Sequence, residues 1–291
     1  MGAVLFWSLS SALIFLGARA MGTWGFVAVA SVTGGLLQLV LRRVYPGELR
    51  SALWLPWRLW AVPVACFVVY GLTWPWALAS STPRQVLGVN LINYLWPVLT
   101  VVLSVWWVPG VRMTGRLGGA LALAVAGLAL ANLSPIHELL SPSGGAEARG
   151  AQRFLPYVLA LVAAVTWAIY SAVLARWKAW AGNYVTSPVG FIVIGLVAAV
   201  ILWATGGTPA KVAPQAIWLT VLYGIGPLAG GYLLWELALT RARVQTLGLT
   251  AAAIPVLSTL LLCCFLRKMP GAELLAAALL VSAGVGLSRG E

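Results

Sequence analysis

Residues 93–100 read NYLWPVLT and lie inside a run, 85–108, that contains no charged residue. An apolar stretch of about 20 residues is long enough to cross a bilayer as an α-helix. A proline inside such a helix removes one N–H donor and frees the carbonyl four residues earlier, here that of Asn93. The stretch therefore predicts a membrane helix that is broken beside an amide side chain.

The composition of the whole chain indicates the same class of protein. The 291 residues are 62% hydrophobic and 8% charged, and the mean hydropathy is +0.96. A soluble domain has about 25% charged residues, so we predict a polytopic membrane protein. The net charge of +12 comes from basic residues placed between apolar runs, where loops meet lipid headgroups, so we expect no nucleic-acid partner.

Ten apolar segments, separated by short polar breaks, are predicted to span the membrane. They cover 3–18, 23–41, 58–80, 85–107, 114–131, 155–175, 185–204, 214–238, 244–266 and 271–288. The first resembles a signal peptide, but it lacks a basic start and we interpret it as a membrane helix, one that is short for a full span. The longest break predicts three parts of the chain: a first repeat (1–131), a connecting loop (132–154) and a second repeat (155–291).

The two halves carry matching fragments in the same order, at offsets of 157 to 160 residues. The pairs are PVLT 97–100 with PVLS 255–258, QVLG 85–88 with QTLG 245–248, AGLAL 126–130 with AGVGL 283–287, and Trp7 and Ser11-Ala12 with Trp167 and Ser171-Ala172. Each half contains five predicted spans. Because five is an odd number, the second half must enter the membrane in the opposite sense to the first. We therefore predict an all-α fold of ten transmembrane helices, arranged as two inverted five-helix repeats around a central cavity.

The basic residues also predict an orientation. With both termini in the cytoplasm, eleven of the 18 Lys and Arg residues lie in inside loops and seven lie outside. Cytoplasmic loops carry the excess of basic residues in membrane proteins. This bias favours cytoplasmic termini.

No motif for catalysis, nucleotide binding or metal binding is present. The sole histidine, His137, lies in the central break, and the three cysteines lie in apolar runs without the spacing of metal ligands. We predict a protein that is not an enzyme and that uses no cofactor and no metal.

Polar and aromatic side chains inside the apolar segments are the candidates for a binding site, because polar groups in a bilayer face the bundle interior or a cavity. The predicted substrate-binding residues are Asn90, Asn93, Tyr94, Trp96, Trp167, Tyr170, Ser171, Tyr70 and Tyr232. The predicted helix breaks or gates are Pro97, Pro255 and Pro227. The simpler alternatives stay open: an asparagine that only bonds a neighbouring helix, a proline that only kinks, and aromatic rings that anchor at the interface.

Glu236 is the only acidic residue within a predicted span. It is a candidate for proton coupling and equally for a salt bridge with Arg241 or Arg243, which follow it. The chain contains no aspartate. Uniport, exchange and proton antiport therefore all stay open.

These fragments resemble a known family. PVLT and PVLS in the fourth and ninth segments, with Ala-Gly-rich fifth and tenth segments, resemble the drug/metabolite transporter (DMT) superfamily over nearly the whole chain. NYLWPVLT is similar to the YddG group of bacterial aromatic amino acid exporters. The resemblance implies a basket of ten helices in the bacterial inner membrane, export of aromatic amino acids, and Trp96 and Trp167 as cavity aromatics. The acid that is common after the fourth and ninth segments of the superfamily is absent here.

Three functions stay open on the sequence. An uncharged aromatic cavity with amides suits a zwitterion that carries an aromatic ring. The leading hypothesis is a secondary transporter that exports aromatic or other bulky neutral amino acids by alternating access. The alternatives are a multidrug exporter of hydrophobic cations such as methyl viologen, and a non-transporting membrane scaffold. We expect a small-molecule substrate and the lipid bilayer as partners, and a monomer.

Overall fold

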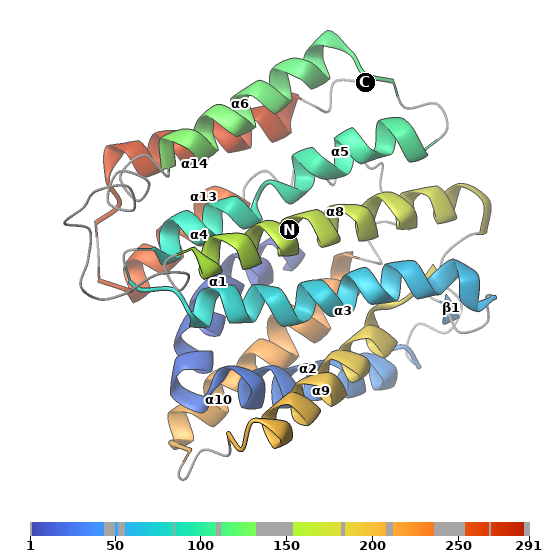
Figure 1. Cartoon of the computed structure of the whole chain (residues 1–291), viewed down its shortest axis with the longest axis vertical. Helices are drawn as coiled ribbons and strands as arrows, with labels where there is room; N and C mark the ends of the chain where they lie inside the picture. Colours follow the sequence, from blue (N-terminus) through green and yellow to red (C-terminus); the bar gives the residue numbers. More distant parts are fainter. Residues whose placement is uncertain are drawn as a thin grey trace.

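The computed structural model describes residues 2–43, 50–51, 56–83, 85–108, 112–131, 154–181, 184–207, 212–235, 254–267 and 269–287. Within these ranges the chain is almost entirely helical (Figure 1). The helices are, in chain order, α1 (Gly2–Met21), α2 (Thr23–Leu41), α3 (Trp57–Ala79), α4 (Val86–Asn93), α5 (Trp96–Trp107), α6 (Gly115–Ala131), α8 (Leu155–Ala181), α9 (Ser187–Ala204), α10 (Pro214–Tyr223), the π-helix η3 (Gly224–Gly231), α13 (Ile254–Phe265) and α14 (Ala272–Leu287). His137, Glu236 and nearly all of the predicted connecting loop lie outside the described residues.

Six helical stretches in the described part are long and apolar enough to cross a membrane. They are Gly2–Met21, Thr23–Leu41, Trp60–Ala79, Leu155–Leu174, Ser187–Ala204 and Pro214–Trp235. Two shorter apolar helices cover Gly115–Gly127 and Ala272–Gly284. The protein is therefore a polytopic α-helical membrane protein, as its composition predicts.

The stretch NYLWPVLT forms the end of one helix and the start of another. Helix α4 ends at Asn93, and α5 begins at Trp96 with Pro97 at its second position. A proline is tolerated in a first turn because the N–H groups there have no intrahelical partner. The chain thus breaks just before the proline, whereas the sequence alone suggested a kink around it. Pro255 likewise stands at the second position of α13, and Pro227 lies inside η3.

Helices of the two halves pack against each other in pairs. Helix α2 lies against α9, α6 lies against α14, α8 contacts α3 and α5, and α1 contacts α13, α10 and η3 (Figure 1). Figure 1 shows α6 and α14 crossing together at one edge of the bundle, away from α2 and α9. The described part of the chain therefore has its main packing contacts between the halves.

Reciprocal glycines permit the close approach in two of these pairs. A Cβ atom at Gly35 of α2 would lie 3.1 Å from the carbonyl oxygen of Pro188, and one at Gly195 of α9 would lie 3.1 Å from that of Ala28. In the other pair, a Cβ at Gly127 of α6 would lie 2.7 Å from a carbonyl oxygen of α14, and one at Gly284 of α14 would lie 2.5 Å from a carbonyl oxygen of α6. Small residues let membrane helices approach at backbone distance. The partners in each pair are 160 and 157 residues apart, the offsets of the matched sequence fragments.

Three contacts show which ends of the helices lie together. Strand β1 (Arg50–Ser51) pairs in parallel with β2 (Tyr184–Val185). An Nη of Arg19 donates to the Ser81 carbonyl at 3.1 Å, and an Nη of Arg176 donates to the Trp107 carbonyl at 3.4 Å. Two points at one end of a bundle are joined by an even number of crossings. The contacts therefore agree with a single membrane crossing by each of α4–α5, α6 and α8. The full arrangement of ten spans in two inverted repeats stays a prediction.

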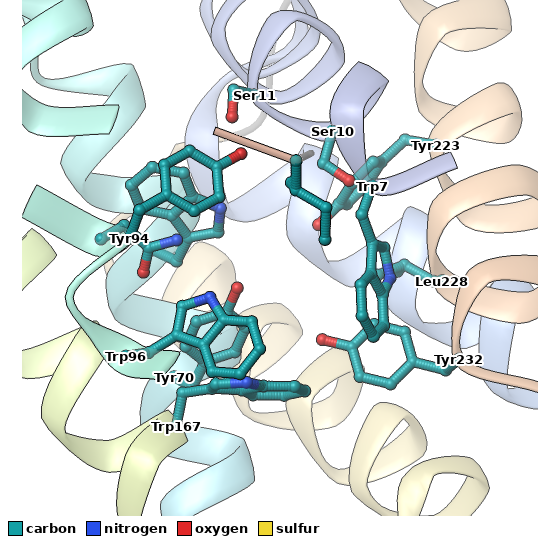
Figure 2. A pocket seen from close by; sticks show the side chains of 13 residues that line it. Trp7, Ser10, Ser11, Tyr70, Tyr94, Trp96, Trp167, Tyr223, Leu228 and Tyr232 are labelled. Atoms are coloured by element: carbon teal, nitrogen blue, oxygen red, sulfur yellow. The ribbon is translucent and has the colours of Figure 1, made fainter. Parts of the chain in front are cut away.

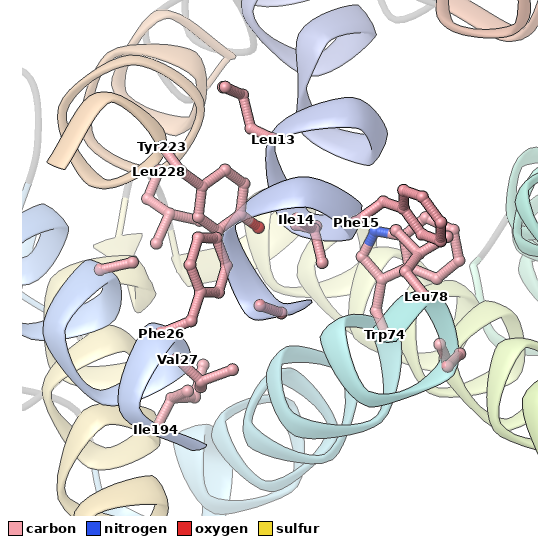
Figure 3. Close-up of a cluster of buried hydrophobic side chains, with 14 of the residues drawn as sticks. Leu13, Ile14, Phe15, Phe26, Val27, Trp74, Leu78, Ile194, Tyr223 and Leu228 are labelled. Atoms are coloured by element: carbon pink, nitrogen blue, oxygen red, sulfur yellow. The ribbon is translucent and has the colours of Figure 1, made fainter. Parts of the chain in front are cut away.

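The core packs α1, α2 and α3 against the second half. Phe15 and Ile14 of α1 face Trp74 and Leu78 of α3, while Phe26 of α2 stacks on Tyr223 with ring centroids 5.2 Å apart (Figure 3). These residues fill the bundle beside the cavity described next.

Candidate functional site

A cavity lies near the middle of the bundle, between α1, α3, α4–α5, α8, α10–η3 and α13 (Figure 2). Its lining is formed by Trp7, Ser10, Ser11, Tyr70, Trp74, Asn93, Tyr94, Trp96, Trp167, Tyr223, Leu228, Tyr232 and Ile254. Eight of these thirteen side chains are aromatic and none is charged. The centres of water-sized molecules have about 50 Å³ of room, which is space for a few waters.

Trp167 of α8 is the centre of the aromatic lining. Its ring centroid lies 4.6 Å from that of Tyr70, 5.5 Å from that of Tyr232 and 5.9 Å from that of Trp96. The pairs with Tyr232 and Trp96 are edge-to-face, with interplanar angles of 86° and 80°. Such pairs contribute about 0.5–1.5 kcal/mol each beyond burial, so the rings hold one another in place before any ligand arrives.

Trp7 of α1 meets Trp167 across the cavity. Their ring centroids are 6.3 Å apart and their planes cross at 88°. Figure 2 shows Trp7 and Tyr232 facing Trp96, Tyr70 and Trp167 across the open space. Trp7 and Trp167 are the two tryptophans that the internal repeat matches, yet the sequence marked only Trp167 as a binding residue. The repeat itself was the signal that could have found Trp7.

A buried triangle of hydrogen bonds joins three helices at the cavity wall, where Ser11 is a lining residue. Ser11 Oγ donates to Asn90 Oδ1 at 2.5 Å, Asn90 Nδ2 donates to Ser258 Oγ at 3.4 Å, and Ser258 Oγ donates to Ser11 Oγ at 3.2 Å. Asn90 is fully buried and does not line the cavity. The sequence predicts it as a binding residue, but its amide is used between helices, which is the simpler alternative. Interhelical bonds of this kind join membrane helices.

Two polar atoms among the lining residues have no hydrogen-bond partner in the described part of the chain. They are Oδ1 of Asn93, a residue that is 4% exposed, and the indole Nε1 of Trp7. The side chain of Asn93 also interacts with Tyr70. Buried polar groups in native proteins are nearly always bonded, so each exception needs an explanation, and a bound water or ligand is one. One free acceptor and one free donor thus stand in an aromatic wall.

The other predicted residues divide into lining and supporting positions. Six of the nine predicted substrate-binding residues line the cavity: Tyr70, Asn93, Tyr94, Trp96, Trp167 and Tyr232. Tyr170 does not line it; its hydroxyl lies 3.1 Å from Thr186 Oγ1, and its ring packs on Trp167. Ser171 does not line it either, and it donates to the Trp167 carbonyl at 2.8 Å. Both therefore support Trp167. Among the predicted breaks, Pro227 and Pro255 are buried.

The π-helix η3 is held by a buried glutamine of α2. Nε2 of Gln38 donates to the carbonyls of Leu228 at 3.2 Å and Ala229 at 3.3 Å, and its Oε1 accepts from Ser187 Oγ at 3.0 Å. A π-helical turn shifts carbonyls away from their usual α-helical partners, and such turns are frequent at functional sites. Since Leu228 lines the cavity, Gln38 fixes one part of the cavity wall from outside.

Comparison with known proteins gives two relatives and a similar solved structure. No family model matches the chain. It is 28% identical to an aromatic amino acid exporter YddG from Ancylobacter novellus over 292 residues, which cover 98% of this chain and 94% of the relative. It is 24% identical to the protein of that name from Salmonella typhimurium over 268 residues, covering 89% and 84%. One protein of known crystal structure, 26% identical, superposes over 98% of this chain and 93% of its own with a TM-score of 0.69.

Proposed function

From the distant homology of this chain to the YddG aromatic amino acid exporters, a group of the DMT superfamily, we propose that it is a secondary transporter of aromatic or other bulky neutral amino acids. It exports them across the bacterial inner membrane by alternating access. Homology supports the class of transporter, and the substrate rests on the cavity. The single observation that carries it is an uncharged aromatic lining with one unpartnered donor and one unpartnered acceptor.

An amino acid zwitterion with an aromatic side chain matches each part of this lining. The ring packs edge-to-face or offset against the tryptophans and tyrosines around Trp167. The ammonium group needs acceptors and aromatic faces, which Asn93 Oδ1 and the indole rings offer. The carboxylate needs a donor, and the candidate is the unpartnered Nε1 of Trp7, which in this structure lies beside Gly231 of η3. A charged side chain in the lining would favour a substrate of the opposite net charge, and the described lining has none.

The same chemistry argues against phosphorylated substrates. A nucleotide sugar or other phosphate ester is recognised by Arg or Lys, because their several donors match the phosphate oxygens. No lining residue is basic in the described cavity. A neutral zwitterion is the better match.

The proposed transport cycle uses the inverted repeat. The helix pairs α2–α9 and α6–α14, and the reciprocal glycines in each, support a two-fold relation between the halves. In inverted-repeat transporters the site lies at the interface of the repeats, and one repeat rocks against the other around it. Trp7 and Trp167, which the repeat matches, both line this cavity and contact each other.

Export of a hydrophobic cation is the second candidate, because uncharged aromatic faces also bind cations. The two functions differ in the use they make of Trp7. An indole N–H donor serves a carboxylate and is of no use to a cation such as methyl viologen. The unpartnered Nε1 therefore favours the amino acid.

Counterflow in proteoliposomes tests the proposal. The purified protein is reconstituted with unlabelled phenylalanine inside, and uptake of labelled phenylalanine is followed without a pH gradient. We expect transient accumulation that protein-free liposomes lack and that Trp167→Ala reduces. Absence of flux with phenylalanine, tyrosine and tryptophan alike would refute the proposal. Flux that methyl viologen blocks far more strongly than unlabelled phenylalanine would favour the cation exporter, and any specific flux argues against a scaffold.

A further inference from the structure

A second, smaller cavity lies directly beside the central one, between α2, α3, α9 and α10–η3. It is lined by Val27, Ser31, Phe67, Tyr70, Gly71, Trp74, Pro75, Phe191, Ile194, Tyr223, Leu228 and Tyr232. Five of these residues also line the central cavity: Tyr70, Trp74, Tyr223, Leu228 and Tyr232. Figure 3 shows Val27 and Ile194 gathered below Tyr223 and Leu228. We call this space the side cavity; one layer of side chains separates it from the central cavity.

The size of the side cavity fits a small group and not a ring. The centres of water-sized molecules have about 20 Å³ there, which is room for one or two waters. A hydroxyl or N–H group at the far edge of a substrate ring is of this size. The ring itself would stay among the shared residues at the edge of the central cavity.

Ser31 supplies an unused polar group in this otherwise mainly apolar space. The residue is 4% exposed, lines the side cavity, and makes no hydrogen bond in the described part of the chain. Serines of other helices bond their own backbone: Ser8 Oγ of α1 donates to the Val4 carbonyl at 2.7 Å, and Ser104 Oγ of α5 donates to the Thr100 carbonyl at 2.7 Å. A hydroxyl on a residue that lines a cavity is available to a water or to a polar group of a ligand.

We propose that the side cavity binds a polar substituent on the aromatic ring of the substrate, and that Ser31 is the residue that determines this specificity. The chemical class is a ring that carries a hydroxyl or an N–H at its far edge, such as the phenol of tyrosine. The inference rests on the proposed function and adds a basis for choice among aromatic amino acids. A buried phenol needs a hydrogen-bond partner, and the Ser31 hydroxyl, on a residue that lines this cavity and is 4% exposed, can serve as one.

The test compares competitors in counterflow of labelled phenylalanine. Half-inhibitory concentrations of tyrosine, phenylalanine and p-fluorophenylalanine are measured with the native chain and with Ser31→Ala. Removing one neutral hydrogen bond should raise the tyrosine-to-phenylalanine ratio about two- to tenfold. The p-fluorophenylalanine-to-phenylalanine ratio should not change, because fluorine is close to hydroxyl in size but cannot donate. Phenylalanine uptake by the variant reports that it is folded.

Ser8→Ala is the matched control. Ser8 is also buried, but it donates to a backbone carbonyl and lines neither cavity. Its tyrosine-to-phenylalanine ratio should equal that of the native chain. An unchanged ratio in Ser31→Ala would overturn the inference and leave the proposed function standing, as would an equal shift for p-fluorophenylalanine, since that would mean a response to size alone. Failure of the native chain to move any aromatic amino acid would defeat the proposed function and this inference with it.

Discussion

Replacing Gln38 by methionine removes the clamp on the π-helix while keeping a side chain of similar length. Gln38 is 1% exposed and bonds Leu228, Ala229 and Ser187. These partners belong to η3 and to the first turn of α9, so one side chain on α2 fixes two other elements. We predict that Gln38→Met lowers the free energy of unfolding and loosens the cavity wall at Leu228.

The expected size of the effect follows from the three bonds. Hydrogen bonds between helices in a membrane contribute about 0.6 kcal/mol on average and about 1.7 kcal/mol at most. Losing all three should therefore cost about 2 kcal/mol. We expect the loss of unfolding free energy to lie at the upper end of this range, because the two η3 carbonyls leave the usual α-helical bonding pattern and have fewer alternative donors.

The free energy of unfolding is measured by titrating the protein in mixed micelles with sodium dodecyl sulfate, followed by circular dichroism. Gln215→Met is the matched control, because Gln215 is exposed at the start of α10. It should change stability by less than about 0.5 kcal/mol. A double-mutant cycle with Ser187→Ala should give a coupling of about 0.6 kcal/mol. Equal stabilities of Gln38→Met and the control, or zero coupling, would refute the prediction that the Gln38 hydrogen bonds stabilise the fold.

Three further predictions test the site, the packing and the topology. Trp7→Phe keeps a ring but loses the N–H donor, so it should weaken counterflow of phenylalanine about tenfold, the value of a hydrogen bond to a charged group. Inhibition by hydrophobic cations should change much less, since only the weaker cation–π face of phenylalanine affects it. Gly284→Ala should destabilise the fold by about 1–3 kcal/mol through overpacking against α6, whereas Gly286→Ala on the same helix meets nothing within 4 Å and should be tolerated; thermal unfolding compares the two. Four single cysteines, placed in a cysteine-free background, form two pairs, and an impermeant maleimide is added from one side of the membrane at a time. It should label both members of one pair from one side and both members of the other pair from the opposite side. Members of one pair that are labelled from different sides would contradict one crossing per predicted span. The pairs are Gly22 with Thr205, and Arg43 with Val108.

The class of fold and much of the cavity could be predicted because both follow from local features. Polarity within apolar segments identified Asn93 and Trp96, and helical spacing placed them together. Spacing alone did not separate Asn93 from Asn90, which lies one turn earlier on α4. The difference depends on α1 and α13, whose serines occupy the amide of Asn90. Contacts between distant segments decide such cases.

Ser31 was missed for a related reason. A serine in an apolar helix usually donates to the carbonyl three or four residues earlier and then has no further role. Nothing in the sequence around Ser31 distinguishes it from Ser8, which does form that bond. Only the cavity between α2, α3 and α9 distinguishes Ser31, because Ser31 lines that cavity and Ser8 lines none.

Under the proposed repeat, the two ends of the cavity differ in this structure. Ser11 and Ser258 bond each other between α1 and α13 at 3.2 Å. Their matched positions are Ser171 and Thr100, and these donate to carbonyls of their own helices, α8 and α5, at 2.8 Å and 2.7 Å. One side thus has a bond between helices where the other has bonds within them, which is the asymmetry that alternating closure of two related gates requires. Asn90 reinforces the bonded side, because its amide bonds both Ser11 and Ser258. Under the proposed transport cycle, the Asn90 amide stabilises the state in which Ser11 and Ser258 are bonded.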